Sequence, residues 1–178
     1  TYDIAVLKVE NSRTLQESSA RAVTVTDSDE AVVGGDVVAV GNPEAEGISA
    51  TQGIVSVLSE EITMTGADDV TKVTFRVMRV DAAINSGNSG GGLFDEKGDL
   101  VGIVNAKVKS DEVENIGYAI PSNVAVNVAE NIIKNCDGSE NTSVRRCMLG
   151  ISVGMESVSV VYDKEEGVTR VVTTVAVK

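Results

Sequence analysis

Short apolar runs of strand length recur along the chain, and polar or glycine-containing turns separate them. Runs of this length between turn residues are typical of β-strands. They predict strands at 3–9, 21–26, 36–41, 53–58, 73–80 and 116–120, a hairpin of 91–94 and 99–104, and later strands at 148–153 and 171–177. The polar stretch 59–71 between two of these runs predicts a mobile loop.

One stretch has helical spacing instead. Pro121 closes the preceding strand, and Ser122 is the predicted N-cap of the helix. The helix is predicted over 123–135 because its apolar residues form one stripe, namely Val124, Val128 and Ile132 with Ala125, Ala129 and Ile133 beside them.

The composition favours a mostly β fold. The chain has 32 Val, 11 Ile and 13 Thr against 6 Leu. β-Branched residues suit pleated surfaces and lose rotamer freedom in helices. The 17 glycines supply turns. An all-β fold with one C-terminal helix is therefore predicted.

The charge balance excludes one class of partner. Lys and Arg total 15 and Asp and Glu total 27, so the net charge is −12. Nucleic-acid binding needs cations that displace phosphate counterions, so a nucleic-acid partner is not expected. Acidic clusters such as 27–30, 60–61 and 111–114 are interpreted as solvated surface. Calcium binding is the alternative, but no EF-hand spacing occurs.

Histidine is absent from the 178 residues. Imidazole metal ligands and a histidine base within this chain are therefore excluded. Cys136 and Cys147 are too few for a disulfide framework or a Cys-rich zinc site, and both one bridge and two free thiols stay open. We predict no metal and no cofactor.

No targeting or membrane-spanning segment is visible. No apolar run reaches the ~18 residues of a membrane span, and no signal peptide is recognisable. The chain begins at Thr1 without Met and reads as a processed or excised segment.

One segment carries candidate chemistry. Gly87-Asn88-Ser89-Gly90-Gly91 puts a serine on a tight turn flanked by glycines. Acyl transfer by serine needs an exposed Oγ and backbone N–H groups that converge on the developing oxyanion, in backbone shapes that glycine permits. The alternative is an ordinary glycine-rich turn between strands.

Six segments in order resemble the HtrA/Deg family of trypsin-like serine proteases, over roughly residues 1 to 150. Together they are far more specific than any one of them. They are Asp3-Ile-Ala-Val-Leu-Lys8, Gly35-Asp36 to Gly41-Asn42-Pro43, Thr51-Gln52-Gly53-Ile54-Val55-Ser56, Asp81 to Gly91, Leu100 to Asn105, and Gly117 to Ser122.

The resemblance implies a role for each matching site residue. Ser89 would be the nucleophile, and its N–H and that of Gly87 would form the oxyanion hole, with Asn88 shaping the turn. Asp3 would orient the catalytic imidazole. Val104, Asn105 and Ala106 would be the edge that pairs with the substrate backbone, and Ile84 would help to line the primary specificity pocket.

The sequence departs from the family in three places. Ser86 replaces a usual Pro, and Gly92 replaces a usual Pro or Ala, which could loosen the loop around Ser89. The missing histidine is the large departure. The family carries it upstream of the triad aspartate, so the resemblance implies that it lies in a part of the fold absent here. The chain would then hold the last strands of the first trypsin-like antiparallel β-barrel and a complete second barrel.

The same resemblance implies a domain division. Residues 1–137 would be an N-terminally incomplete protease domain, 138–144 a linker, and 145–178 the beginning of a PDZ domain. Residues Met148–Ile151 would be its carboxylate-binding loop. The alternative for the tail is a C-terminal hairpin packed on the barrel.

The implied function is a serine endopeptidase of protein quality control and stress response, which cleaves misfolded or exported proteins without a cofactor. Unfolded polypeptides would be the substrates, and peptide C-termini would bind if the PDZ domain is complete in the parent. The parent would be a homotrimer in an extracytoplasmic location, either periplasmic or membrane-anchored on the cell surface. This fragment would be inactive for want of the histidine. The alternative is a non-catalytic peptide-binding or scaffold protein of protease ancestry.

Overall fold

The computed structural model describes residues 2–43, 47–65, 70, 72–105, 116–135, 153–163 and 168–177. The chain divides into two compact units, Thr1–Val144 and Arg145–Lys178. Each unit is described by itself below.

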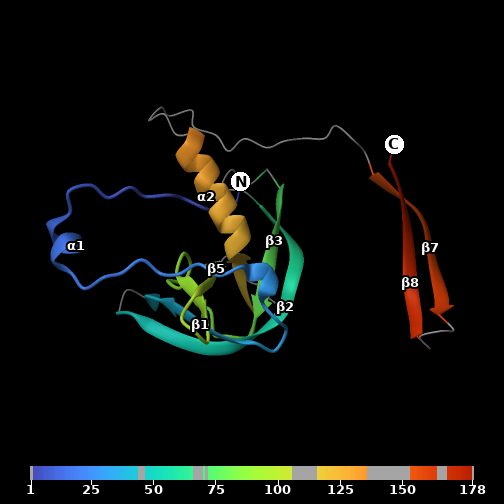
Figure 1. The fold of residues 1–178 in the computed structure, drawn as a ribbon, viewed down its shortest axis with the longest axis horizontal. Helices are drawn as coiled ribbons and strands as arrows, with labels where there is room; N and C mark the ends of the chain where they lie inside the picture. The colour runs from blue at the N-terminus through green and yellow to red at the C-terminus, as the bar shows by residue number, and fades with distance from the viewer. Residues whose placement is uncertain are drawn as a thin grey trace. The chain divides into compact units, whose positions relative to one another are not determined.

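The first unit contains a closed barrel of six strands in the order β1-β2-β3-β6-β5-β4 (Figure 1). Every neighbouring pair is antiparallel, and the pairing of β1 with β4 closes the barrel. This confirms the predicted antiparallel β fold. The strands are β1 (Asp36–Gly41), β2 (Ser49–Thr65), β3 (Lys72–Val80), β4 (Gly92–Asp95), β5 (Leu100–Asn105) and β6 (Gly117–Pro121).

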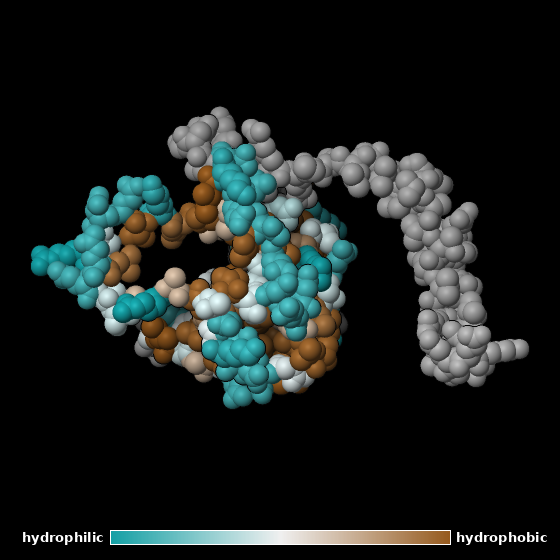
Figure 2. Space-filling view, viewed as in Figure 1, coloured by the Kyte–Doolittle hydropathy of each residue, from teal (hydrophilic) through white to brown (hydrophobic). Residues whose placement is uncertain are grey.

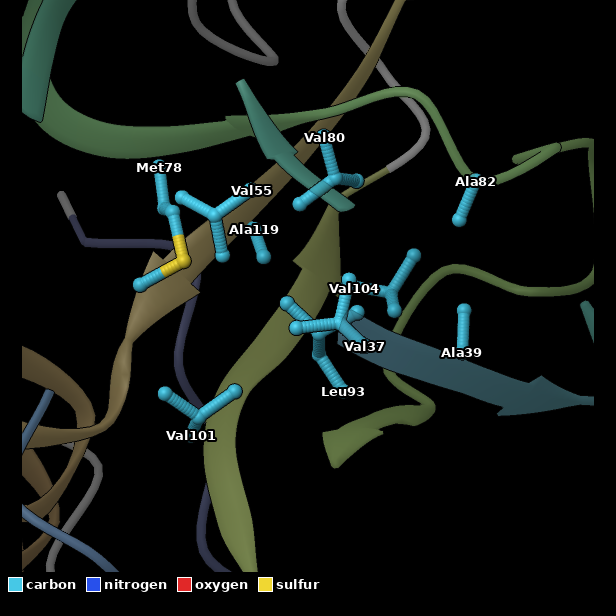
Figure 3. Packing of buried hydrophobic residues seen from close by; sticks show 10 residues of the cluster. All are labelled: Val37, Ala39, Val55, Met78, Val80, Ala82, Leu93, Val101, Val104 and Ala119. Atoms are coloured by element: carbon cyan, nitrogen blue, oxygen red, sulfur yellow. The ribbon is translucent and has the colours of Figure 1, made fainter. Parts of the chain in front are cut away.

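The core of the barrel is built from small and β-branched side chains. Alternate residues of a strand face the same side, so Val37 and Ala39 of β1 point inward and are 2% and 1% exposed. Figure 3 shows the side chains of this cluster directed toward one another. Its buried members are Val37, Ala39, Val55, Met78, Val80, Ala82, Leu93, Val101, Val104 and Ala119.

Helix α2 (Ser122–Asn135) follows β6 and contacts β5 and β6 (Figure 1). It confirms the predicted helix, but its first turn is not held as predicted. Ser122 lies inside the helix and donates its hydroxyl to the Thr26 carbonyl at 2.7 Å. The Asn123 N–H donates instead to the Ser28 hydroxyl at 3.2 Å. Ser28 belongs to the 3-10 helix η1 (Ser28–Glu30), so a residue remote in sequence caps α2.

The two strands predicted before β1 are wrong. Residues 2–10 form no strand, and a short helix, α1 (Arg13–Glu17), follows them. The run 21–26 makes one isolated parallel bridge, between Val25 and Leu100. A strand needs a neighbour that pairs its N–H and C=O groups along its length. Among the described residues, the run 21–26 is paired at Leu100 through Thr24 and Thr26, and residues 2–10 join no sheet. Figure 2 shows apolar patches along this segment, whose exposed residues include Leu7, Val9, Leu15 and Val23.

The predicted loop at 59–71 is also wrong in its first half. Strand β2 continues to Thr65 and pairs with β3 as far as Lys72, with register shifts between Val55 and Glu60. The Thr63 and Thr74 hydroxyls lie 2.7 Å apart across the pair. Residues 66–69 and 71 lie outside the described residues.

The second unit contains an antiparallel two-stranded sheet of β7 (Val153–Asp163) and β8 (Val168–Val177). Strand β8 contains the predicted strand 171–177. Of the strand predicted at 148–153, only Val153 is described, and β7 runs on to Asp163. The proposed carboxylate-binding loop at 148–151 lies outside the described residues.

Candidate active site

The segment 87–91 forms a tight double turn at the end of the loop between β3 and β4. Gly87 and Gly90 have φ of 96° and 83°, a region in which a side chain would be strained. The Asn88 N–H donates to the Asn85 carbonyl at 3.0 Å, and the Gly91 N–H donates to the Asn88 carbonyl at 2.9 Å. Ser89 lies between these two bonds and is exposed.

Main-chain hydrogen bonds fix this turn on β5 and on the end of β1. The Gly90 N–H donates to the Val104 carbonyl at 2.9 Å, and the Val104 N–H donates to the Gly91 carbonyl at 2.8 Å. On the other side, the Asn42 N–H donates to the Gly87 carbonyl at 3.2 Å. The position of Ser89 is therefore set by two strands of the barrel.

The Asn88 side chain is buried between the turn and β1, with 2% of its surface exposed. Its Nδ2 donates to the Ala83 carbonyl at 3.4 Å, whereas its Oδ1 has no hydrogen-bond partner. A Cβ at Gly41 would lie 2.4 Å from Asn88 Oδ1 and 2.7 Å from Asn88 Cα. The turn can therefore approach β1 this closely only because residue 41 is glycine.

Asp81, the first residue of the loop after β3, is hydrogen-bonded to β2. Asp81 Oδ1 accepts from the Ile54 N–H at 2.6 Å, and the Asp81 N–H donates to the Ile54 carbonyl at 3.3 Å. Asp81 therefore anchors the end of β3 to β2. A Cβ at Gly53 would lie 2.3 Å from the Ala82 nitrogen, so this glycine also permits a close approach.

Asp3 is hydrogen-bonded to Asn105, the last residue of β5. It is exposed and has φ of 54°, and its Oδ2 accepts from Asn105 Nδ2 at 3.2 Å. Asn105 is 2% exposed and follows Val104, which holds the Ser89 turn. The structure thus attaches Asp3 and the Ser89 turn to adjacent residues of one strand.

Of the remaining predicted site residues, Ile84 and Val104 are described and Ala106 is not. Ile84 is half-buried, and a Cβ at Gly117 of β6 would lie 2.5 Å from its Cγ1. Val104 is buried, and its N–H and C=O pair with the turn. Ala106 lies outside the described residues.

Sequence reasoning missed three residues that hold the loop, namely Gly41, Asn42 and Thr51. All three belong to segments that carry the family resemblance. For Gly41 and Asn42, the signal that could have found them is the Gly-Asn-Pro break directly after an apolar strand, where a chain leaves the sheet toward a neighbouring loop. Thr51 has no such local signal.

No group of three or more His, Cys, Asp or Glu in the described part of the chain is arranged to hold a metal ion. No helix in it is long and apolar enough to cross a membrane.

Comparisons with known proteins agree with one another. Residues 1–103 match the protein family described as trypsin-like peptidase domain. The chain is 34% identical over 153 residues to the serine protease Do-like HtrA of Bacillus subtilis, with 85% of this chain and 31% of that protein covered. It is 39% identical over 153 residues to a probable periplasmic serine protease do/HhoA-like of Haemophilus influenzae, with 85% and 29% covered. The chain spans about a third of the length of these curated relatives.

Two solved structures are similar as well. The HtrA-type protease AlgW with a decapeptide has a TM-score of 0.56 and 34% identity, and the match covers 76% of this chain and 38% of that chain. The same protease with a tripeptide has a TM-score of 0.52 and 32% identity, with 78% and 40% covered.

Proposed function

This chain belongs to the HtrA/Deg family of trypsin-like serine proteases, and from that premise we propose that it is the part of a serine endopeptidase that carries the nucleophile, Ser89. The turn 87–91 carries the proposal, because two left-handed glycines expose Ser89 while main-chain bonds to Val104 and Asn42 hold it in place.

The reaction is acyl transfer. Ser89 Oγ attacks the carbonyl carbon of a peptide bond, and its proton passes to a base. The N–H groups of Gly87 and Ser89, in a turn shaped by Asn88, donate to the oxyanion; one such donor is worth about 10²- to 10³-fold in kcat. Collapse of the tetrahedral intermediate expels the amine as the base returns the proton. Water then hydrolyses the acyl-enzyme, and no cofactor is needed.

The base is the part that these 178 residues do not supply, because they contain no histidine. We assign this role to an imidazole from a part of the protein outside this chain, with Asp3 as the carboxylate that orients it. The hydrogen bond from Asn105 supports this role of Asp3, because it holds the carboxylate beside the strand that fixes the Ser89 turn. The chain alone is then inactive.

The substrates are polypeptides in an extended conformation, as misfolded or exported chains present. Asn105 and Ala106 pair with the substrate main chain, and Val104 joins this edge to the turn. Ile84 lines the pocket for the side chain before the scissile bond. The peptides in the two similar structures are consistent with such a substrate class.

The rest of the parent is proposed from the family. Residues 1–137 are the protease domain, 138–144 a linker and 145–178 the start of a PDZ domain that binds peptide C-termini. A homotrimer and an extracytoplasmic location go with this assignment, and the printed descriptions of two relatives as periplasmic support the location.

Casein cleavage tests the proposal. The purified 178-residue chain should not cleave casein, whereas the longer gene product that carries the histidine should. Ser89→Ala in the longer product should lower kcat by about 10⁶-fold, as loss of a triad nucleophile does. Robust cleavage by this chain, abolished by Ser89→Ala, would refute the assignment of the base to another segment.

The alternative is a non-catalytic peptide-binding or scaffold protein, and the missing histidine is the observation that favours it. A longer gene product that also has no histidine upstream of Asp3, binds unfolded casein and leaves it intact would establish that alternative and overturn the protease proposal.

A further inference from the structure

We propose that Thr51 of β2 is a positioning residue for the Ser89 turn, acting through the Ala83 carbonyl and the Asn88 side chain. This inference rests on the proposed function, because it assigns the residue that sets one oxyanion donor. Thr51 belongs to a segment of the family resemblance that the roles of Ser89, Gly87 and Asp3 leave unexplained.

Thr51 lies half-buried on the strand β2, next to the loop that carries Ser89. Residues two apart on a strand face the same side, so Thr51 shares the inward face of β2 with Gly53 and with Val55, which is 2% exposed. In the register of the sheet, Thr51 lies opposite Ala39 of β1, which is 1% exposed. Thr51 itself is half-buried, and its hydroxyl makes its hydrogen bond to the loop at an exposed site and not within the core.

The partner of this hydroxyl is a main-chain carbonyl of the loop that carries Ser89. Thr51 Oγ1 donates to the Ala83 carbonyl at 2.9 Å, across 32 positions of sequence. The same carbonyl accepts from Asn88 Nδ2 at 3.4 Å. A carbonyl oxygen has two lone pairs, so one atom of Ala83 joins β2 to the residue that precedes the nucleophile.

The orientation of the Asn88 side chain depends on the position of the Ala83 carbonyl. This side chain is 2% exposed, and its Oδ1 has no hydrogen-bond partner. The hydrogen bond from Asn88 Nδ2 to the Ala83 carbonyl therefore holds the Asn88 side chain in place. Asn88 also contributes the carbonyl half of the peptide group whose N–H belongs to Ser89. A rotation of Asn88 consequently moves one of the two proposed oxyanion donors.

The decisive change is Thr51→Val, which keeps the shape of the side chain and removes the hydroxyl. Thr51→Ser restores the hydroxyl without the methyl group. Thr63→Val is the matched control, because Thr63 also lies on β2 and its hydroxyl pairs with that of Thr74, not with the loop.

The first readout uses this chain and needs no catalysis. In ¹⁵N–¹H spectra, Thr51→Val should shift the Asn88 side-chain amide and the Ser89 N–H, and it should speed hydrogen exchange of the Gly90 N–H. Thr51→Ser and Thr63→Val should leave all three signals at their wild-type positions and rates. Wild-type signals of Asn88 and Ser89 in folded Thr51→Val would overturn the proposal. Should Thr51→Val fail to fold, Thr51→Ala provides the same two outcomes.

The second readout is kinetic and uses the longer gene product that carries the histidine. Thr51→Val should lower kcat about 3- to 10-fold, as loss of one hydrogen bond predicts, with KM unchanged. Thr51→Ser should recover kcat. An unchanged kcat, or a loss confined to KM, would overturn the positioning role. If the wild-type longer product is inactive, the proposed function fails, while the spectra still decide whether Thr51 holds the turn.

Discussion

At the scale of single residues, the glycines outside the nucleophile turn decide how closely it can approach the barrel. A Cβ at Gly41 would meet Asn88, and a Cβ at Gly53 would meet Ala82, in both cases well below van der Waals distance. Overpacking of this kind costs about 1–3 kcal/mol and forces the neighbouring backbone to move. Here the backbone that would move is the loop that presents Ser89.

One carboxylate makes stability depend on pH. The Asp29 N–H and the Asn123 side-chain amide donate to Asp27 and hold the pKa of its carboxyl below its usual value. A group whose pKa is lowered on folding stabilises the protein above its unfolded pKa, about 3.9 for Asp. That contribution is lost as the pH falls through the lower pKa of the folded state.

Asp27→Asn should therefore lower the thermal midpoint at neutral pH, and its difference from wild type should shrink as the pH falls below about 4. Thermal melts of both proteins between neutral and strongly acidic pH measure this difference. A difference that stays constant across the whole range would contradict the assignment of the effect to the Asp27 carboxylate.

At the scale of elements, the start of α2 shows what a local pattern misses. Ser122 has the residue type of an N-cap and stands directly before the apolar stripe, yet its hydroxyl is used by Thr26. The helix N–H of Asn123 is instead bonded by Ser28, which lies 95 positions away in the sequence. A cap supplied by tertiary structure leaves no trace in the residues around the helix.

Ser28→Ala should consequently destabilise the first unit by about 1 kcal/mol, because it removes a cap from a helix packed on the barrel. Ser12→Ala is the matched control. Ser12 caps α1 through the Leu15 N–H, but α1 contains no buried residue, so its loss should leave global stability nearly unchanged. Urea unfolding measures both. Equal effects of the two variants would show that the contact of Ser28 with α2 contributes nothing.

A strand prediction was correct where the run pairs with a neighbouring strand of the barrel, and it was wrong where the run joins no sheet. The runs 36–41, 53–58 and 73–80 have partners in the barrel, and the structure confirms them. Neither of the runs 3–9 and 21–26 joins a sheet of the described residues, and the second is paired only at Leu100. The run 59–65 is the opposite case, because it is polar and yet forms a strand. Its Glu60 Oε2 lies 3.5 Å from Arg79 Nη1 of β3, and both side chains are half-buried. Cross-strand charge pairs stabilise such a ribbon although its sequence resembles a loop.

At the scale of the whole molecule, sequence patterns identified the chemical groups of the site but not what holds them. The glycine-flanked serine was visible as a local motif, and Asp3 entered through the order of six segments. The contact of Asp3 with Asn105 spans 102 positions, that of Thr51 with Ala83 spans 32, and the bond from Asn42 to Gly87 is nonlocal as well. Such contacts follow from the register of the closed barrel, which no short window of sequence contains.

The groups that the chain contains determine what it can do alone. It holds the residues proposed as nucleophile, oxyanion donors and orienting aspartate, but it has no histidine and spans about a third of the length of its curated relatives. An unassisted serine is a weak nucleophile, so a preformed turn by itself should not make Ser89 reactive.

Covalent labelling of Ser89 by a fluorophosphonate, read by mass spectrometry, tests the central claim most directly. The longer gene product with its histidine should be labelled at Ser89, and its Ser89→Ala variant and the 178-residue chain should stay unlabelled under the same conditions. Labelling of the longer product at another residue, or equal labelling of Ser89 in the 178-residue chain, would contradict the account.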